Sequence, residues 1–155
     1  MAATASLKLT VDDFKEDAMM AEAKEMAKTM EEGCGIYRQA DTMQATCDKI
    51  AELRVRYENI SVQDKGQRFN TDLLEAIELG FLLDLAEVLA LTSRERRESR
   101  GAHLREDFLA RDDEKFMVHS MAYLTDKPAK KPGDNIKVGW KPVIVTNYQP
   151  MERKY

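Results

Sequence analysis

The residues best suited to chemistry in this 155-residue chain lie between positions 94 and 115. This charged segment carries seven basic and seven acidic side chains, so its net charge is zero. Within it, Arg100, His103 and Arg105 could clamp a dicarboxylate, because a guanidinium binds a carboxylate through paired hydrogen bonds and a histidine can carry a proton near neutral pH. Equal numbers of acids and bases are also typical of a structural ion-pair network. On the residues alone we favour the network, and these three residues stay as candidates for catalysis.

Other familiar catalytic and ligand-binding patterns do not occur in the sequence. It has no GxGxxG or GxxxxGK(S/T) phosphate loop, and no HExxH or GxSxG sequence. We therefore expect no cofactor or metal site within this chain. The two cysteines, Cys34 and Cys47, lack the spacing of a zinc site and are expected to be free thiols. A net charge of -4 and a pI near 5.3 argue against nucleic-acid binding.

Three helices are expected to position the charged segment. Apolar side chains recur at helical spacing over residues 11–33, 41–58 and 71–100, each near a capping residue. The last helix is apolar on more than one face, which indicates a central position in a bundle. Residues 1–10 are expected to be a flexible segment. The predicted core consists of Met26, Met30, Ile50, Leu53, Leu74, Ile77, Phe81, Leu85 and Val88.

The last third of the chain changes from helical to β-rich composition. Residues 116–123 and 136–145 show the alternation of two strands, and residues 125–135 are rich in turn formers. Because two strands alone are marginally stable, this hairpin must pack on the helices or on another polypeptide. We predict a mainly α fold, with a three-helix bundle-like domain over residues 11–101. A charged loop, the C-terminal β-hairpin and an extended tail follow over residues 102–155.

The charged segment resembles the signature of a known enzyme family. A signature near the end of succinate dehydrogenase and fumarate reductase flavoprotein subunits is similar to three runs here: Arg97-Glu98-Ser99-Arg100-Gly101-Ala102-His103, Arg105-Glu106-Asp107-Phe108 and Arg111-Asp112-Asp113. The start of the third helix and the tail up to Tyr155 also resemble that family. The tail is most similar to actinobacterial succinate dehydrogenases and less similar to L-aspartate oxidases. The resemblance extends from about Ala21 to Tyr155.

The chain departs from the family pattern in sequence and in extent. Leu109 stands where the family usually has proline, and Arg97 where it commonly has lysine. Residues 1–20 match no part of the family that we can place. In the family, the flavin and capping domains precede this region and hold the covalent flavin histidine, the substrate-binding residues and the proton-delivering arginine. The chain therefore resembles a fragment, a separately expressed domain or a split subunit rather than a complete enzyme.

The resemblance implies a role within a larger enzyme. The chain would be the C-terminal helical domain of a succinate dehydrogenase flavoprotein, supporting the flavin domain and subunit assembly in a complex that oxidises succinate to fumarate and passes electrons to quinone. FAD would lie in the parent subunit and iron–sulfur clusters in a partner subunit, and this chain alone would not be catalytic. The expected structural and interface motif is Arg97, Glu98, Ser99, Arg100, Gly101, His103, Arg105, Glu106, Asp107, Arg111 and Asp112.

The expected partners are the flavin and capping domains of the same subunit and the iron–sulfur subunit, with no nucleic acid. In a bacterial source, such a complex would lie on the cytoplasmic face of the inner membrane, and this chain would touch the membrane only through the complex. Two alternatives stay open. The chain could belong to a fumarate reductase or L-aspartate oxidase flavoprotein, or it could be a stand-alone interaction or assembly module.

Overall fold

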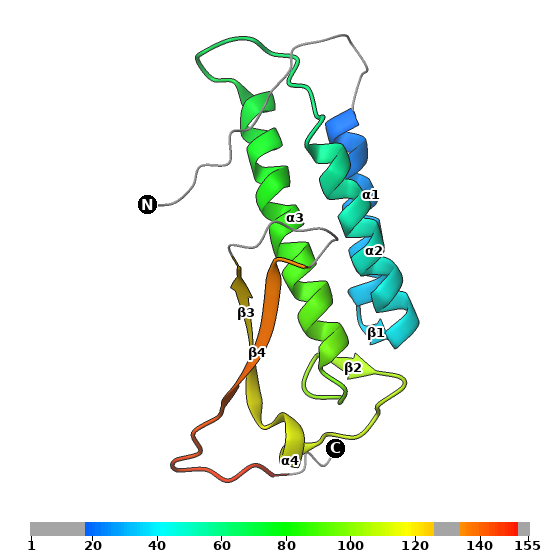
Figure 1. Cartoon of the computed structure of the whole chain (residues 1–155), viewed down its shortest axis with the longest axis vertical. Coiled ribbons are helices and arrows are strands. Elements are labelled where there is room, and N and C mark those ends of the chain that lie inside the picture. The colour runs from blue at the N-terminus through cyan, green and yellow to red at the C-terminus, as the bar shows by residue number, and fades with distance from the viewer. Residues whose placement is uncertain (1–17, 126–133, 152–155) are drawn as a thin grey trace.

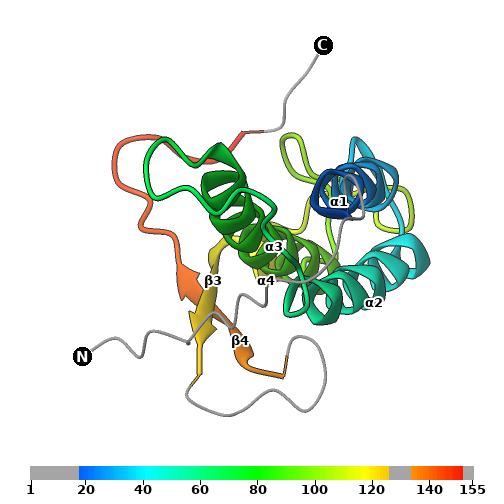
Figure 2. The same cartoon turned by 90° about the horizontal axis from the view of Figure 1, so that it is seen from above.

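The fold is built around three long helices. It was obtained as a computed structural model that describes residues 18–125 and 134–151. The helices are α1 (Ala18–Cys34), α2 (Ala40–Tyr57) and α3 (Thr71–Glu95), and consecutive helices run in opposite directions (Figure 1). Seen from above, α1 and α2 lie together on one side of α3, and a β-hairpin lies on another side (Figure 2). The predicted mainly α fold with a C-terminal hairpin is confirmed.

Side-chain caps decide where two of the helices begin. Asn70 caps α3, because its side chain accepts a hydrogen bond from the Leu73 N–H at 2.8 Å. Gln39 is the N-cap of α2, and its N–H donates to Thr42 Oγ1 at 3.3 Å. α2 therefore starts at Ala40, just before the predicted start. The predicted start of α1 lies outside the described residues.

The bundle core consists of two apolar clusters. One contains Met26, Ile50, Leu53, Ile60, Leu79, Leu83 and Ala86. The other contains Cys34, Met43, Cys47, Ala90 and Leu91. Both cysteines are buried free thiols, as predicted. Burial raises the pKa of Cys47 to about 11, so this sulfur acts as a small apolar group rather than as a nucleophile.

The predicted core is correct for α1 and α2 and wrong for one face of α3. Met26, Ile50 and Leu53 are buried, and Met30 packs against them. Four predicted core residues are instead exposed and a fifth is half-buried: Leu74, Ile77, Phe81, Leu85 and Val88. Both faces of α3 are apolar, and periodicity alone does not say which of two such faces meets the neighbouring helices.

α3 ends earlier than its sequence pattern predicts. The last helical residue is Glu95 rather than Arg100, and Arg96 is already extended, with φ −81° and ψ 100°. The side chains that follow Glu95 find buried partners in the next loop, which a continued helix would not let them reach. Gly101 lies in a tight turn with φ +59°. The Arg100 N–H donates to the His103 carbonyl at 2.9 Å and closes this turn.

A small parallel sheet and a single helical turn flank the charged segment. β1 (Tyr37–Arg38) pairs with β2 (Leu104–Arg105). This pairing joins the α1–α2 connection to the charged segment. α4 (Asp113–Phe116) is one turn long and is capped by the Asp112 carboxylate. Neither strand of this sheet was predicted, because a two-residue strand leaves no periodic signal.

The predicted hairpin is present and packs on α3. β3 (Val118–Leu124) pairs antiparallel with β4 (Ile136–Pro142), and Ser120 lies opposite Trp140. β4 ends before the predicted position 145. Ile136 and Val138 pack against the second core cluster. Most of the predicted loop 125–135 lies outside the described residues.

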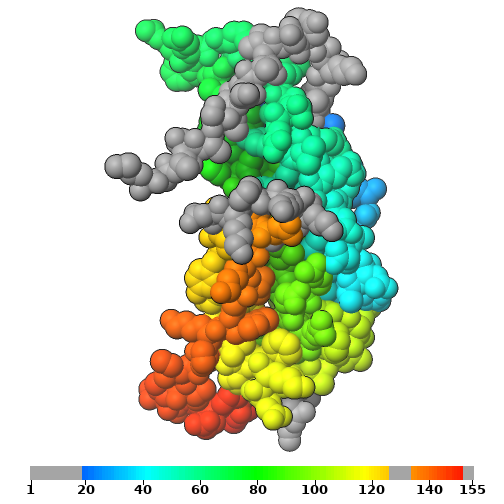
Figure 3. Space-filling model, viewed as in Figure 1, coloured from blue at the N-terminus to red at the C-terminus, as the bar shows by residue number. Residues whose placement is uncertain are grey.

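Residues 143–151, which follow the hairpin, form one end of the molecule together with the charged segment (Figure 3). They have no regular structure, and Arg111 Nη1 donates to the Met151 carbonyl at 3.0 Å. Within residues 18–125 and 134–151, no helix has the length and apolar character required to cross a membrane.

Candidate functional site

Glu98 is the centre of the charged segment. Its side chain is 0% exposed. Arg100 donates to both of its oxygens, at 2.8 and 3.0 Å, and Arg96 forms a further short ion pair with it. The Asp112 N–H donates to Glu98 Oε2 at 2.9 Å. One buried carboxylate therefore connects the end of α3 to the start of α4.

These bonds keep Glu98 ionised despite its burial. Burial alone would raise the pKa of Glu98, but the hydrogen bonds from Arg100, the Asp112 N–H and Arg96 outweigh it and hold the pKa below its ordinary value. A buried carboxylate is tolerated only when it is paired in this way. The arrangement suits a fixed structural anion rather than a proton-exchanging group.

Arg105 closes the C-terminal end of α3. The side chain is 1% exposed, and Nη1 lies 3.1–3.3 Å from the carbonyl oxygens of Ser93, Arg94 and Arg96. The other edge of the guanidinium donates to both oxygens of Asp107 at 2.7 Å. Helix C-terminal carbonyls lack partners within the helix and favour a cation. Arg105 thus supplies the cap that the early end of α3 requires.

Two side chains tie the backbone of the loop to these charges. The Arg105 N–H donates to Ser99 Oγ at 2.8 Å, and the Ser99 hydroxyl lies 2.9 Å from the Phe108 carbonyl that can accept from it. The Asp107 carboxylate also accepts from the Ala40 N–H, at the start of α2, at 3.2 Å. The loop is therefore held to the ends of two helices at once.

His103 is fixed in one neutral form. Its Nδ1 lies 2.8 Å from Arg38 Nη1, which can only donate, and its Nε2 lies 3.0 Å from the Arg96 carbonyl, which can only accept. The ring proton therefore sits on Nε2. Burial lowers the pKa of His103, and the guanidinium groups of Arg38 and Arg105 lower it further. Both ring nitrogens are occupied within the chain.

Arg96 joins the charged segment to the hairpin. It donates to the carbonyls of Phe116, at 3.0 Å, and Val118, and to Ser120 Oγ at 3.2 Å. Its guanidinium lies 5.6 Å from the ring centres of both Phe116 and Trp140. Packing between two aromatic rings adds cation–π attraction to these hydrogen bonds.

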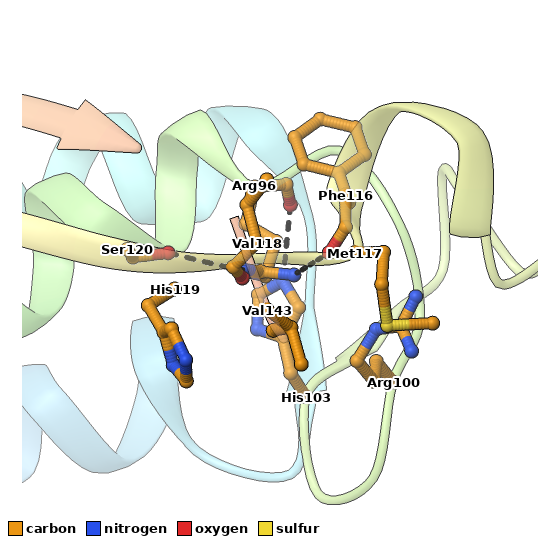
Figure 4. A pocket seen from close by; sticks show the side chains of 9 residues that line it. All are labelled: Arg96, Arg100, His103, Phe116, Met117, Val118, His119, Ser120 and Val143. Carbon is orange, nitrogen blue, oxygen red and sulfur yellow. Dashed lines mark hydrogen bonds between the residues drawn. The ribbon is translucent and has the colours of Figure 1, made fainter. Parts of the chain in front are cut away.

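The three catalytic candidates do not converge on one open space. Arg100 and His103 line a cleft of about 500 Å³, shown in Figure 4, whereas Arg105 lies buried beneath the last turn of α3. In Figure 4, Arg96 reaches across this cleft between Ser120 and Phe116. The cleft is lined by Arg96, Arg100, His103, Phe116, Met117, Val118, His119, Ser120 and Val143.

The other motif residues occupy the surface of the loop. Arg97 is exposed, and exposed Glu106 accepts a hydrogen bond from the Gln39 side chain. Asp112 Oδ1 caps α4 by accepting from the Lys115 N–H at 3.0 Å. Arg111 pairs with Asp113 at 2.7 Å.

Sequence reasoning missed the role of Arg38. This residue lies in the α1–α2 connection, and its Nε donates to the Gly35 carbonyl at 2.8 Å while Nη1 contacts His103. It is 65 positions away from His103, and no periodic or motif signal links the two. Only the pairing of β1 with β2 brings them together.

Chemically, the described side chains of this region hold one another rather than a cofactor. No group of three or more His, Cys, Asp or Glu residues that could bind a metal occurs in the described parts of the chain. A dinucleotide pyrophosphate needs free N–H groups at a helix N-terminus. The N-terminal N–H groups of Ala40 and Leu73 are already bonded to Asp107 and Asn70. These two N–H groups are therefore not available to a phosphate.

Comparison with known proteins identifies the family. A family model described as the C-terminal part of the fumarate reductase flavoprotein matches residues 23–155. The fumarate reductase flavoprotein subunit of Haemophilus influenzae is 45% identical over 131 residues, which cover 84% of this chain and 21% of that protein. The succinate dehydrogenase flavoprotein subunit of Rickettsia bellii is 36% identical over 121 residues, covering 78% and 19%.

A solved structure shares the fold. The Escherichia coli quinol fumarate reductase matches with a TM-score of 0.80 and 38% identity, over 92% of this chain and 24% of that chain. The chain spans about a fifth of the length of the curated relatives it matches. The chain belongs to the fumarate reductase and succinate dehydrogenase flavoprotein family, of which it forms the C-terminal domain.

Proposed function

We propose that this chain is the structural C-terminal domain of a flavoprotein subunit that interconverts succinate and fumarate. It supports the flavin domain and the assembly of the complex. FAD lies in the remainder of the subunit, iron–sulfur clusters lie in a partner subunit, and quinone exchanges electrons with the complex. The complex lies on the cytoplasmic face of the membrane. Fumarate reductase and succinate dehydrogenase subunits among the relatives support this shared chemistry.

The observation that carries the structural role is the closed hydrogen bonding of the charged segment. Glu98 is buried among three donor groups, and Arg105 is buried against three carbonyls and one carboxylate. Groups engaged in this way determine the path of residues 96–113. A substrate clamp would need donors aimed at open space.

Direct participation in catalysis is a second candidate, and one observation favours it. The Arg100 side chain is 29% exposed, and it lines the same cleft as His103. If the rest of the subunit closes this cleft over a dicarboxylate, Arg100 would contact it.

A full-length subunit separates the two candidates. We would join the part of the Haemophilus influenzae fumarate reductase flavoprotein that precedes the matched region to residues 23–155 of this chain. In this fusion subunit, Arg100→Ala, His103→Ala and Arg105→Ala are compared for thermal midpoint, recovery of the iron–sulfur subunit, and turnover per bound flavin. Arg97→Ala is the control, because Arg97 is exposed.

The structural role predicts that Arg105→Ala and His103→Ala lower the thermal midpoint and the recovery of complex, while assembled enzyme keeps its turnover. A loss of turnover in Arg100→Ala, with stability and assembly intact, would support catalysis instead. Deletion of residues 23–155 without loss of assembly would contradict the proposed support role.

A further inference from the structure

The cleft between the charged segment and the hairpin has a chemical bias that the support role does not use. Its volume of about 500 Å³ is sufficient for a small organic molecule. None of the nine residues that line it is acidic, although the whole chain has a net charge of -4. Its lining includes two arginines and two histidines. The cleft therefore presents the opposite electrostatic preference to the chain as a whole.

Arg100 keeps one unused donor group at this cleft. Its Nε and Nη2 donate to the two oxygens of Glu98, and Nη2 also donates to Asp113 at 2.6 Å. Nη1 forms no hydrogen bond with any described residue. Because Glu98 holds the opposite edge of the planar guanidinium, the direction of Nη1 is fixed. Its two N–H groups are thus positioned to bind an acceptor that enters the cleft.

The other polar groups of the cleft are compatible with an anion. Ser120 Oγ accepts from Arg96 Nε at 3.2 Å, so the hydroxyl proton is not used in that bond. His119 is exposed, and its ring forms no hydrogen bond with a described residue. His103 is different, because both of its ring nitrogens are already bonded. The cleft therefore offers donors to a ligand and no carboxylate that would repel a negative charge.

The remaining lining favours hydrocarbon. Met117, Val118 and Val143 are half-buried along the cleft. The Val143 N–H donates to the Met117 carbonyl at 3.2 Å, which fixes these two residues beside one another. Figure 4 shows Arg100 and His119 on opposite sides of Val143. An inorganic anion would leave these apolar side chains in water, whereas a ligand with a hydrocarbon part would cover them.

We propose that this cleft binds a small carboxylate with a short apolar stem, with Arg100 Nη1 as the anchoring donor. The stem lies against Met117 and Val143. Glu98 and Asp113 already neutralise part of the Arg100 charge, so binding is weak, with a dissociation constant of about 1–10 mM for so small a ligand. Only one edge of one guanidinium is free, so a second carboxylate on the same molecule would meet the apolar lining.

A titration of the 155-residue chain followed by NMR tests the assignment directly. Sodium butyrate is compared with butyramide, which has the same shape without the charge, and with sodium chloride. We expect the Nε–H signal of Arg100 to shift saturably with butyrate alone, while that of buried Arg105 stays unchanged as an internal control. An equal response to butyramide or chloride, or an equal shift at Arg105, would overturn the proposal. Tighter binding of succinate than of butyrate would overturn the assignment of a single carboxylate.

Matched tryptophan substitutions test the position of the ligand without touching the ion-pair network. Val143→Trp fills the cleft, whereas Ile144→Trp is the control, because Ile144 is 83% exposed and does not line the cleft. We expect Val143→Trp to weaken butyrate binding at least about tenfold and Ile144→Trp to leave it unchanged. Equal affinities in the two variants would place butyrate elsewhere. The Arg100 signal is read in the unsubstituted chain, so that result does not depend on how either variant folds.

The fusion subunit shows whether the cleft stays open in a longer polypeptide. The methyl signal of Met117 is followed during the butyrate titration, with and without Val143→Trp. We expect a saturable shift that Val143→Trp removes. No shift in the fusion subunit would mean that the preceding part of the polypeptide fills the cleft, and would overturn its assignment as a site for a free carboxylate. Deletion of residues 23–155 without loss of assembly would contradict the support role and leave the butyrate result standing.

Discussion

The two ends of α3 are held by opposite kinds of interaction. Where α3 packs against α1 and α2, it is held by burial of Leu79, Leu83 and their apolar neighbours. Beyond Glu95, the chain buries Glu98 and Arg105 as deeply as the bundle buries leucine. The first region gains stability from apolar area removed from water, and many shapes of side chain can supply it.

The charged region obeys a stricter rule. A buried charge loses its hydration, and its partners offset this desolvation free energy only when all of them are in place. Glu98 receives donors from Arg96, Arg100 and the Asp112 backbone, so no single one of them is dispensable. The apolar core therefore stabilises the fold and tolerates substitutions that change side-chain shape. The ion-pair network fixes one specific path of the chain and tolerates few substitutions.

The largest effect is expected from Glu98→Ala, which breaks the network at its centre. Removing this carboxylate leaves Arg96 and Arg100 without their buried counter-charge, and should cost about 3–5 kcal/mol of unfolding free energy. Urea unfolding of the isolated chain measures it, with exposed Glu52→Ala as the control. A cost below about 1 kcal/mol would show that the network behaves as a surface ion pair.

The second prediction tests the tolerance of the apolar region. Leu53 is fully buried, and Leu53→Ala should cost about 2–5 kcal/mol through the cavity it leaves. Leu53→Met keeps most of the volume and should cost less than about 1.5 kcal/mol. Glu98→Gln also keeps the volume but removes the charge, so it should resemble Glu98→Ala. Equal costs for Leu53→Met and Glu98→Gln in urea unfolding would remove the contrast between the regions.

Arg105→Lys tests geometry at constant charge. Lysine keeps the positive charge but cannot donate to both Asp107 oxygens and to the carbonyls of Ser93, Arg94 and Arg96 at once. We expect a loss of about 1.5–3 kcal/mol, the scale of hydrogen bonds to a charged group. Amide hydrogen exchange should rise in the last turn of α3 and stay unchanged at Leu53. Wild-type stability in this variant would mean that charge alone caps the helix.

The smallest effect concerns pH. The pKa of His103 is lowered by burial, so the unfolded chain binds a proton at a higher pH than the folded chain does. The stability that neutral His103 contributes is therefore fully present above the unfolded pKa of about 6.5. It is lost as pH falls below that value, by at most about 1.4 kcal/mol per pH unit. His103→Asn should flatten the difference in unfolding free energy between pH 7.5 and 5.5. An unchanged slope in this variant would place the titration elsewhere.

The start of α3 could be predicted from the sequence, whereas its end could not. The predicted start at residue 71 rests on a local signal, and the structure confirms it: the Leu73 N–H donates to the side chain of the capping residue, Asn70. The end at Glu95 was not predicted, since the apolar and charged pattern continues to Arg100. Its cause is Arg105, which reaches back to carbonyls 9 to 12 positions earlier. No local propensity contains that contact.

The candidate site shows the same division. The motif from Arg97 to Asp113 was found from its residue types and its resemblance to a family. Which members are buried, and which line the cleft, could not be predicted: Glu98 and Arg105 are buried, whereas Arg100 lines the cleft with His103. The role of Arg38 was not predicted, because a single arginine between two helices belongs to no periodic or motif pattern.

By itself, the sequence determined the three helices, the hairpin and the family of this protein, because helical periodicity, strand alternation, caps and motif residues are properties of neighbours along the chain. Tertiary structure alone decided which apolar face of α3 is buried, where that helix ends, and which charges pair. Each of these depends on groups distant in sequence, such as Arg38 and His103, 65 positions apart. The energy of a buried charge or an apolar face is set by what is packed against it, and only the folded chain specifies that.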